Sequence, residues 1–133
     1  MTVRIDHVAL WTQDLDRLKG FYMGYFGAHA GPHYVNPAKG FESCFLSFSE
    51  GARIEIMRTT SVSLSRPAAD TQPFGLTHLA ISVGSGALVD ELANRLRSDG
   101  TPLLDGPRRT GDGAYLAVAL DPDGNRVEIC AAP

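Results

Sequence analysis

Two histidines and two glutamates recur at matching intervals along the chain. The stretch Ile5-Asp-His7-Val-Ala-Leu returns as Leu76-Thr-His78-Leu-Ala-Ile, and Arg-Ile-Glu55-Ile returns as Arg-Val-Glu128-Ile. The histidines are 71 positions apart and the glutamates 73, so both matches have nearly the same offset. Imidazole and carboxylate together are typical ligands of divalent transition metals. The four residues therefore predict one divalent ion per chain, with zinc, nickel, cobalt, iron and manganese all open.

The shared offset indicates that one structural module occurs twice. We expect the modules at residues 1–59 and 76–131 of a single domain, 1–133. The segment 60–75 between them is rich in serine and contains prolines, which is typical of a linker.

Each module has the pattern of a strand, a helix and three further strands, which predicts an α+β fold. The strands are expected at 3–11, 28–34, 41–48 and 52–59, and again at 76–83, 101–108, 114–120 and 125–131. Asp14 and Ser85 are suitable N-caps for the two helices, and Gly27 and Gly100 are suitable stops.

Alternation along the strands predicts which sheet face carries the candidate ligands. Each glutamate stands between two branched apolar residues, so its carboxylate should point away from the face that packs against the helix. We expect both glutamates and both histidines to line one concave surface, beside the small residues Ala9 and Ala80. Two carboxylates brought together there would repel each other unless a cation lay between them.

Composition and charge argue against several other classes of protein. The chain has 133 residues and a net charge of −3, so it lacks the basic excess of a nucleic-acid-binding surface. Its longest apolar run, 114–120, is seven residues, whereas a membrane-spanning helix needs about 20. Cys44 and Cys130 form no CxxC pair, and the N-terminal residues do not resemble a secretory signal. We therefore expect reduced thiols, a cytoplasmic protein and no membrane or nucleic-acid partner.

The repeat, the spacing of the four residues and one C-terminal segment together resemble a known family. That segment is Pro107-Arg-Arg-Thr-Gly-Asp-Gly113 followed by Asp121-Pro-Asp-Gly-Asn-Arg-Val-Glu128. Over essentially its whole length the chain resembles the vicinal oxygen chelate superfamily, the group of glyoxalases, bleomycin-resistance proteins and extradiol dioxygenases. The resemblance implies two tandem βαβββ modules that form a cupped, eight-stranded mixed sheet around one metal. It also implies a homodimer, for which the apolar strand 41–48 is the expected exposed edge.

The set of ligands distinguishes the members of this group. Two histidines and two glutamates look most like glyoxalase I, a lyase that isomerises a small substrate with vicinal oxygens through an enediolate. By this resemblance Glu128 is the catalytic base and Glu55 is its counterpart on the other side of the substrate. One alternative is an iron-dependent extradiol dioxygenase, whose pattern has no acidic ligand at the position of Glu55. Another is a drug-binding protein like those of bleomycin resistance, which lack the ligands.

The positions that would bind the substrate depart from the glyoxalase I pattern. That pattern has an arginine four residues after the first histidine and an asparagine four residues after the first glutamate, where this chain has Trp11 and Thr59. The departures argue against glutathione as a co-substrate, and we expect Trp11 and Thr59 to contact a different substrate. Arg108 and Arg109 are candidates for binding an anionic group, although paired arginines after a proline are also typical of solvent-facing positions.

Overall fold

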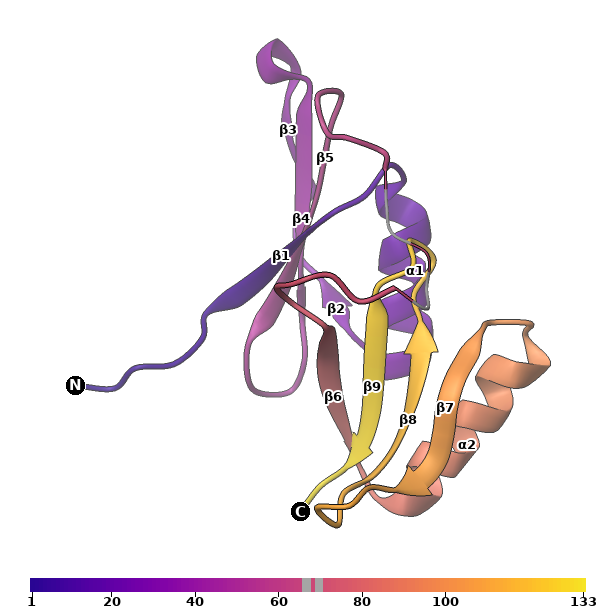
Figure 1. Ribbon diagram of the computed structural model, residues 1–133. Helices are drawn as coiled ribbons and strands as arrows, with labels where there is room; N and C mark the ends of the chain where they lie inside the picture. The colour runs from indigo at the N-terminus through magenta and orange to yellow at the C-terminus, as the bar shows by residue number, and fades with distance from the viewer. Residues whose placement is uncertain (66–67, 69–70) are drawn as a thin grey trace. The chain divides into compact units, whose positions relative to one another are not determined.

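The chain divides into two compact units, residues 1–65 and 66–133, each with a sheet and an α-helix (Figure 1). The computed structural model describes residues 1–65, 68 and 71–133. The boundary between the units falls inside the predicted linker 60–75, of which residues 66–67 and 69–70 lie outside the described part.

Unit 1 contains a five-stranded mixed sheet. Its elements are β1 (His7–Trp11), α1 (Leu15–Phe26), β2 (His29–Ala30), β3 (Tyr34–Asn36), a 3-10 turn (Pro37–Lys39), β4 (Phe41–Ser47) and β5 (Arg53–Thr59). The strand order is β1-β5-β4-β2, and β3 also pairs with β4. β1 runs parallel to β5, while the other pairs are antiparallel.

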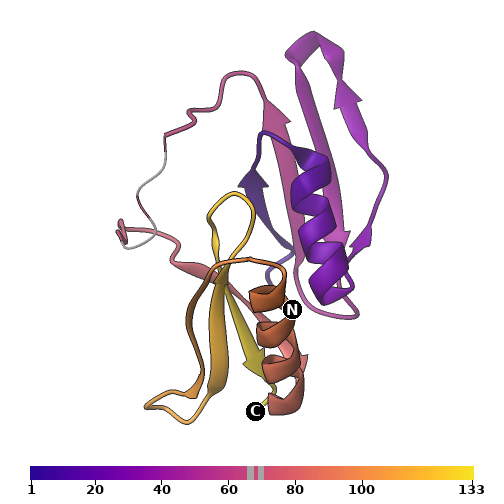
Figure 2. The same ribbon diagram turned by 90° about the vertical axis from the view of Figure 1, so that its right-hand side faces the viewer.

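Helix α1 begins and ends at the predicted residues. The Asp14 side chain accepts a hydrogen bond from the Arg17 N–H (3.0 Å), and Gly27 ends the helix with a φ of 65°, a conformation that favours glycine. Leu18 and Tyr22 are fully buried, as is Ile56 of β5. This apolar stripe packs the helix against one face of the sheet (Figure 2).

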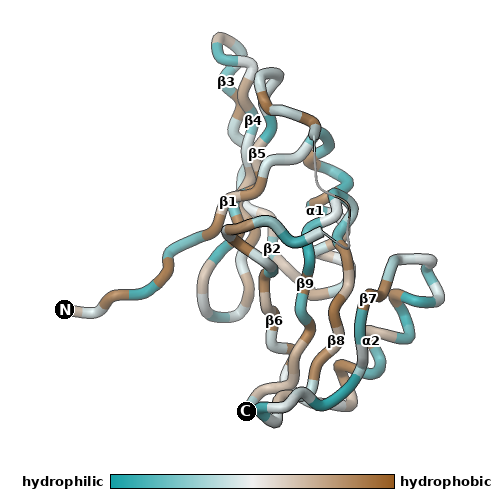
Figure 3. The backbone as a smooth tube through the Cα atoms, viewed as in Figure 1, coloured by the Kyte–Doolittle hydropathy of each residue, from teal (hydrophilic) through white to brown (hydrophobic). Residues whose placement is uncertain are grey.

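Unit 2 repeats the arrangement with a four-stranded sheet. Its elements are β6 (His78–Gly84), α2 (Gly86–Ser98), β7 (Leu103–Arg109), β8 (Tyr115–Leu120) and β9 (Arg126–Ala131). The strand order is β6-β9-β8-β7, with β6 parallel to β9. Ser85 caps α2 as predicted, by accepting from the Leu88 N–H (3.2 Å). Hydrophobic residues run along β8, and Ala117 and Ala119 of that strand are fully buried (Figure 3).

The α+β class and the repeated order of elements are confirmed, but several details differ from the predictions or are not confirmed. The first strand, expected at 3–11, begins at His7. The expected strand 28–34 is broken into β2 and β3 at Gly31-Pro32, because proline has no N–H to donate to a ladder. The described strands form one five-stranded sheet in unit 1 and one four-stranded sheet in unit 2, so a single eight-stranded sheet is not confirmed. The strand at 41–48 is not an edge, because β4 pairs with β5 on one side and with β2 and β3 on the other. Among the described residues no helix has the length and apolar character needed to cross a membrane.

Candidate functional site

In unit 1, strands β1 and β5 bring two of the predicted ligands together. Their parallel register sets His7 opposite Arg53 and Ala9 opposite Glu55. The small Ala9 side chain leaves room for the imidazole and the carboxylate to meet, and His7 Nε2 lies 3.5 Å from Glu55 Oε1. Ile54 and Ile56 on either side of the glutamate are buried, as the alternation predicts.

Unit 2 builds the same pair from β6 and β9. The register sets His78 opposite Arg126 and Ala80 opposite Glu128, position for position as in unit 1. His78 Nε2 lies 3.2 Å from Glu128 Oε2. The repeat in the sequence is therefore a repeat of local geometry, and each unit supplies one imidazole and one carboxylate on the sheet face away from its helix.

The chemistry of these two pairs suits a divalent cation. Ligands in neighbouring positions of a six-coordinate ion, each bonded at about 2.1 Å, lie about 3 Å from one another. The two nitrogen–oxygen separations, 3.5 Å and 3.2 Å, are close to that value. Within either unit, no third His, Cys, Asp or Glu of the described residues joins the pair to form a metal-binding group. Each unit thus offers two donors, and the set of four stays a prediction.

Asp6 orients the first histidine, a role that the sequence analysis missed. Its Oδ2 lies 2.8 Å from His7 Nδ1 and 2.7 Å from Arg53 Nη2. The hydrogen bond to His7, followed by the interactions with Arg53, lowers the pKa of Asp6 below its ordinary value. An anionic Asp6 favours the tautomer with its proton on Nδ1, and Nε2 then presents a lone pair toward Glu55. With the proton on Nδ1, a metal ion between Nε2 and the carboxylate would satisfy both acceptors.

The Arg53 side chain contacts both Asp6 and the phenyl ring that packs against His7. Its guanidinium lies 4.1 Å from the centre of the Phe45 ring, and the His7 ring meets the same phenyl ring edge-on at 5.2 Å. In unit 2 the position of Asp6 is taken by Thr77, whose hydroxyl lies 3.1 Å from His78 Nδ1. The two histidines therefore have different supports, one anionic and one neutral. The residue before each histidine was the only signal in the sequence for these partners.

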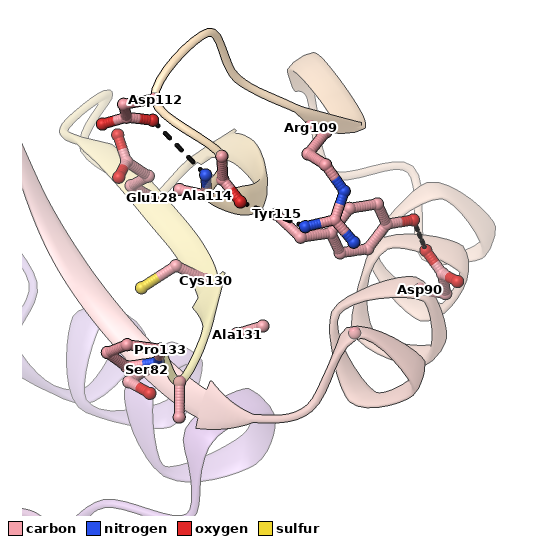
Figure 4. Close-up of a pocket in the computed structure, with 13 residues that line it drawn as sticks. Ser82, Asp90, Arg109, Asp112, Ala114, Tyr115, Glu128, Cys130, Ala131 and Pro133 are labelled. Carbon is pink, nitrogen blue, oxygen red and sulfur yellow. Dashed lines mark hydrogen bonds between the residues drawn. The ribbon is translucent and has the colours of Figure 1, made fainter.

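A pocket of about 740 Å³ opens in unit 2, and Glu128 forms part of its wall (Figure 4). Its other walls include Cys130 of β9 and residues Arg109, Asp112 and Tyr115 around the β7–β8 turn. A volume of this size is typical of sites for small organic molecules. The carboxylate that faces His78 is therefore also within reach of a molecule in this pocket.

Hydrogen bonds occupy several polar groups of the pocket. The Tyr115 hydroxyl donates to Asp90, which raises the pKa of Tyr115. Asp112 accepts from the Thr110 hydroxyl and from the Ala114 N–H, and both bonds lower the pKa of Asp112.

The thiol of Cys130 is held in its neutral form. Burial, and next the negative charge of Glu128, raise the pKa of the Cys130 thiol. A protonated thiol is a poor nucleophile, which argues against Cys130 as the reactive group of this pocket.

The four residues predicted to bind the substrate fall into two groups. Trp11 and Thr59 lie in unit 1 around Phe41: Thr59 is its register partner, and the Trp11 ring meets it edge-on at 6.4 Å. Arg108 and Arg109 lie in unit 2, where Arg108 is paired with Asp105 and Arg109 lines the pocket. The structure thus separates two neighbouring arginines that the sequence left equivalent.

Comparison with known proteins identifies the family. The model of the Glyoxalase/Bleomycin resistance protein/Dioxygenase superfamily matches residues 4–129. This chain therefore belongs to that superfamily. Comparison with curated proteins finds no match.

Solved structures of the same superfamily have the same fold. The glyoxalase I of Leishmania major, described as trypanothione-dependent, is 23% identical with a TM-score of 0.77, over 98% of this chain and 87% of that one. A glyoxylase/bleomycin resistance protein/dioxygenase domain from Frankia sp. EAN1pec is 18% identical with a TM-score of 0.82, over the full length of both chains. The glyoxalase I of Zea mays is 25% identical with a TM-score of 0.75. The match covers 97% of this chain and 44% of that longer chain.

Proposed function

We propose that this protein is a divalent-metal-dependent lyase or isomerase of glyoxalase type, acting on a small substrate with vicinal oxygens. The observation that carries the proposal is the pair formed by His78 and Glu128, whose carboxylate lines a pocket. The pair of His7 and Glu55 repeats it in the same register in unit 1. Membership of the superfamily and the likeness to glyoxalase I structures support it.

The four donors would hold the ion, which when bound acts as a Lewis acid toward the oxygens of the substrate. The carboxylate of Glu128 accepts a proton from the carbon next to the substrate carbonyl, and the electron pair of that C–H bond moves into an enediolate. The same carboxylate, or Glu55 as its predicted counterpart, would then return a proton to the neighbouring carbon, while the hydroxyl proton passes from one substrate oxygen to the other. Hydrogen only changes position within the substrate, so the reaction needs no oxidant or reductant.

Metal analysis combined with a proton-transfer assay tests this proposal. The protein is loaded with zinc, nickel, cobalt, iron or manganese and given hemithioacetals of methylglyoxal formed with a panel of thiols that includes glutathione. We expect one ion per chain and product formation that depends on the ion. Because Trp11 and Thr59 stand where glyoxalase I has groups that hold glutathione, we expect the glutathione adduct to be a poor member of the panel. If no metal-loaded form of the protein isomerises any of the adducts, the proposal is contradicted.

The Asp6→Asn substitution is expected to weaken metal binding by about 10–100-fold, the usual cost of losing a residue that orients a metal-binding histidine. The amide is neutral and can turn its NH₂ group toward His7, so it no longer favours the tautomer with a free Nε2. The matched control is Thr77→Val, which removes a neutral partner from the other histidine and should cost less. Competition with a chromophoric chelator measures both affinities. Equal losses in the two variants would show that the charge of Asp6 is not what matters.

We also propose that the protein is a homodimer. β1 is an edge strand of its sheet, and this strand and the residues before it expose large apolar side chains, with Val3 80%, Ile5 69% and Trp11 45% exposed. An apolar edge of this kind is readily covered by a second copy of the chain. Light scattering at micromolar concentration should give twice the monomer mass, and a mass of one chain would contradict the proposal.

A further inference from the structure

We infer that Arg109 binds a carboxylate group of the substrate, at the end of an apolar portion that extends away from the reacting carbons. The inference rests on the proposed function in one respect, because it takes the reacting carbons to lie at Glu128. It assigns to this pocket a class of ligand: small molecules with vicinal oxygens at one end and a monoanionic carboxylate at the other.

The two adjacent arginines differ in what already holds them. Nε and Nη2 of Arg108 both donate to the Asp105 carboxylate, each at 2.8 Å, which is a complete bidentate pair. Arg109 donates from Nη1 to the Gly113 carbonyl (3.0 Å), and its guanidinium lies 5.7 Å from the centre of the Tyr115 ring. It forms no ion pair with any carboxylate in the part of the chain that the structure describes. Arg109 is thus held in position by neutral groups while its charge stays available to a ligand.

The pocket is polarised from one side to the other. In Figure 4 the carboxylates of Glu128 and Asp112 lie on one side, and the guanidinium of Arg109 lies on the other, over Tyr115. The third carboxylate, Asp90, lies on the Arg109 side, where it accepts a hydrogen bond from the Tyr115 hydroxyl. Ala114 and the Tyr115 ring stand between the two sides, so the intervening surface is largely apolar. A ligand that spans the pocket would meet acidic groups at its reacting end, an apolar stretch, and one cation at its far end.

The charge inventory favours a carboxylate over a phosphate. Arg109 is the one basic residue among the pocket's described lining, which also contains Asp90, Asp112 and Glu128. Repulsion from these three carboxylates penalises a dianion more than a monoanion. A planar carboxylate also matches the two parallel N–H donors of a guanidinium. The Tyr115 hydroxyl, already donating to Asp90, adds no further donor for phosphate oxygens.

Binding of simple aromatic probes to the metal-free protein tests the inference without any turnover. Benzoate, benzamide and phenyl phosphate are titrated while backbone amide signals are followed by ¹⁵N NMR. We expect benzoate to shift the amides of residues 109–115 and to bind more tightly than either of the other probes. In Arg109→Gln the affinity for benzoate should fall about tenfold, the usual value of a charge-assisted hydrogen bond. Benzoate should then bind no more tightly than benzamide.

Arg108→Gln is the matched control, because it removes the same charge one residue away. We expect it to leave benzoate binding nearly unchanged, since Asp105 already neutralises that guanidinium. Equal losses in the two variants would overturn the inference in favour of a diffuse charge effect. Benzamide binding as well as benzoate, or phenyl phosphate binding better, would overturn the assignment to a carboxylate. These outcomes do not depend on metal, so a failure of the metal-loading assay would contradict the proposed function and leave the anion site standing.

Discussion

The Glu128→Gln substitution is expected to reduce turnover by about 10²–10⁴-fold, the usual contribution of a positioned general base. The metal content should fall far less, because the amide oxygen of glutamine can still coordinate a cation although it cannot accept a proton from carbon. Glu128 is the carboxylate that both faces His78 and lines the pocket, so binding and catalysis should separate at this residue. The measurement is turnover of the best hemithioacetal together with metal analysis of the same preparation.

The matched control for this result is Glu55→Gln in unit 1. Glu55 has the same register relation to its histidine but does not line the unit 2 pocket. We expect this variant to keep more activity than Glu128→Gln at similar metal content. A fully active Glu128→Gln would contradict the assignment of the base, and a reversed order of the two variants would transfer that role to Glu55.

Removal of either candidate histidine is expected to abolish metal binding and activity together. In His7→Ala and in His78→Ala one unit retains a single carboxylate in place of a pair 3.5 Å or 3.2 Å apart. Losing a group that only orients a ligand costs 10–100-fold in affinity, so loss of the ligand itself should cost more than about 100-fold. Metal analysis after dialysis against a weak chelator measures the loss, and circular dichroism checks the fold.

Unit 1 contains a second His–Glu pair that serves as the control. His33 Nε2 lies 3.3 Å from Glu42 Oε1, as close as the proposed ligands, but Glu42 also pairs with Arg58 at 3.4 Å. The carboxylate is thus already compensated by Arg58, and the pair has no counterpart among the described residues of unit 2. We expect His33→Ala to keep the full metal content. Unchanged metal in both His7→Ala and His78→Ala, or loss in His33→Ala, would contradict the proposed ligand set.

The parts of this protein that the sequence determined are those that depend on local or periodic patterns. Helix α1 lies between Asp14 and Gly27 as predicted, because capping needs only a side-chain acceptor and a residue that tolerates positive φ. Strand alternation predicted that the histidines and glutamates share the sheet face away from the helix, and the nearly equal offsets of 71 and 73 predicted the repeated module. The α+β class and the order of elements followed for the same reason. The pairing of each histidine with the glutamate of its own unit came from the strand registers.

The tertiary structure alone decided which charged residues form pairs and which strands lie at the edge of a sheet. Two arginines in succession carry the same sequence signal, yet Asp105 neutralises Arg108 and Arg109 faces the pocket. The expected edge at 41–48 became an inner strand, because β2 and β3 cover its far side. Asp6 precedes β1, so alternation could not predict its bond to His7 Nδ1. In each case the outcome depends on which group arrives within about 3 Å through folding, and no periodic pattern in the chain encodes that distance.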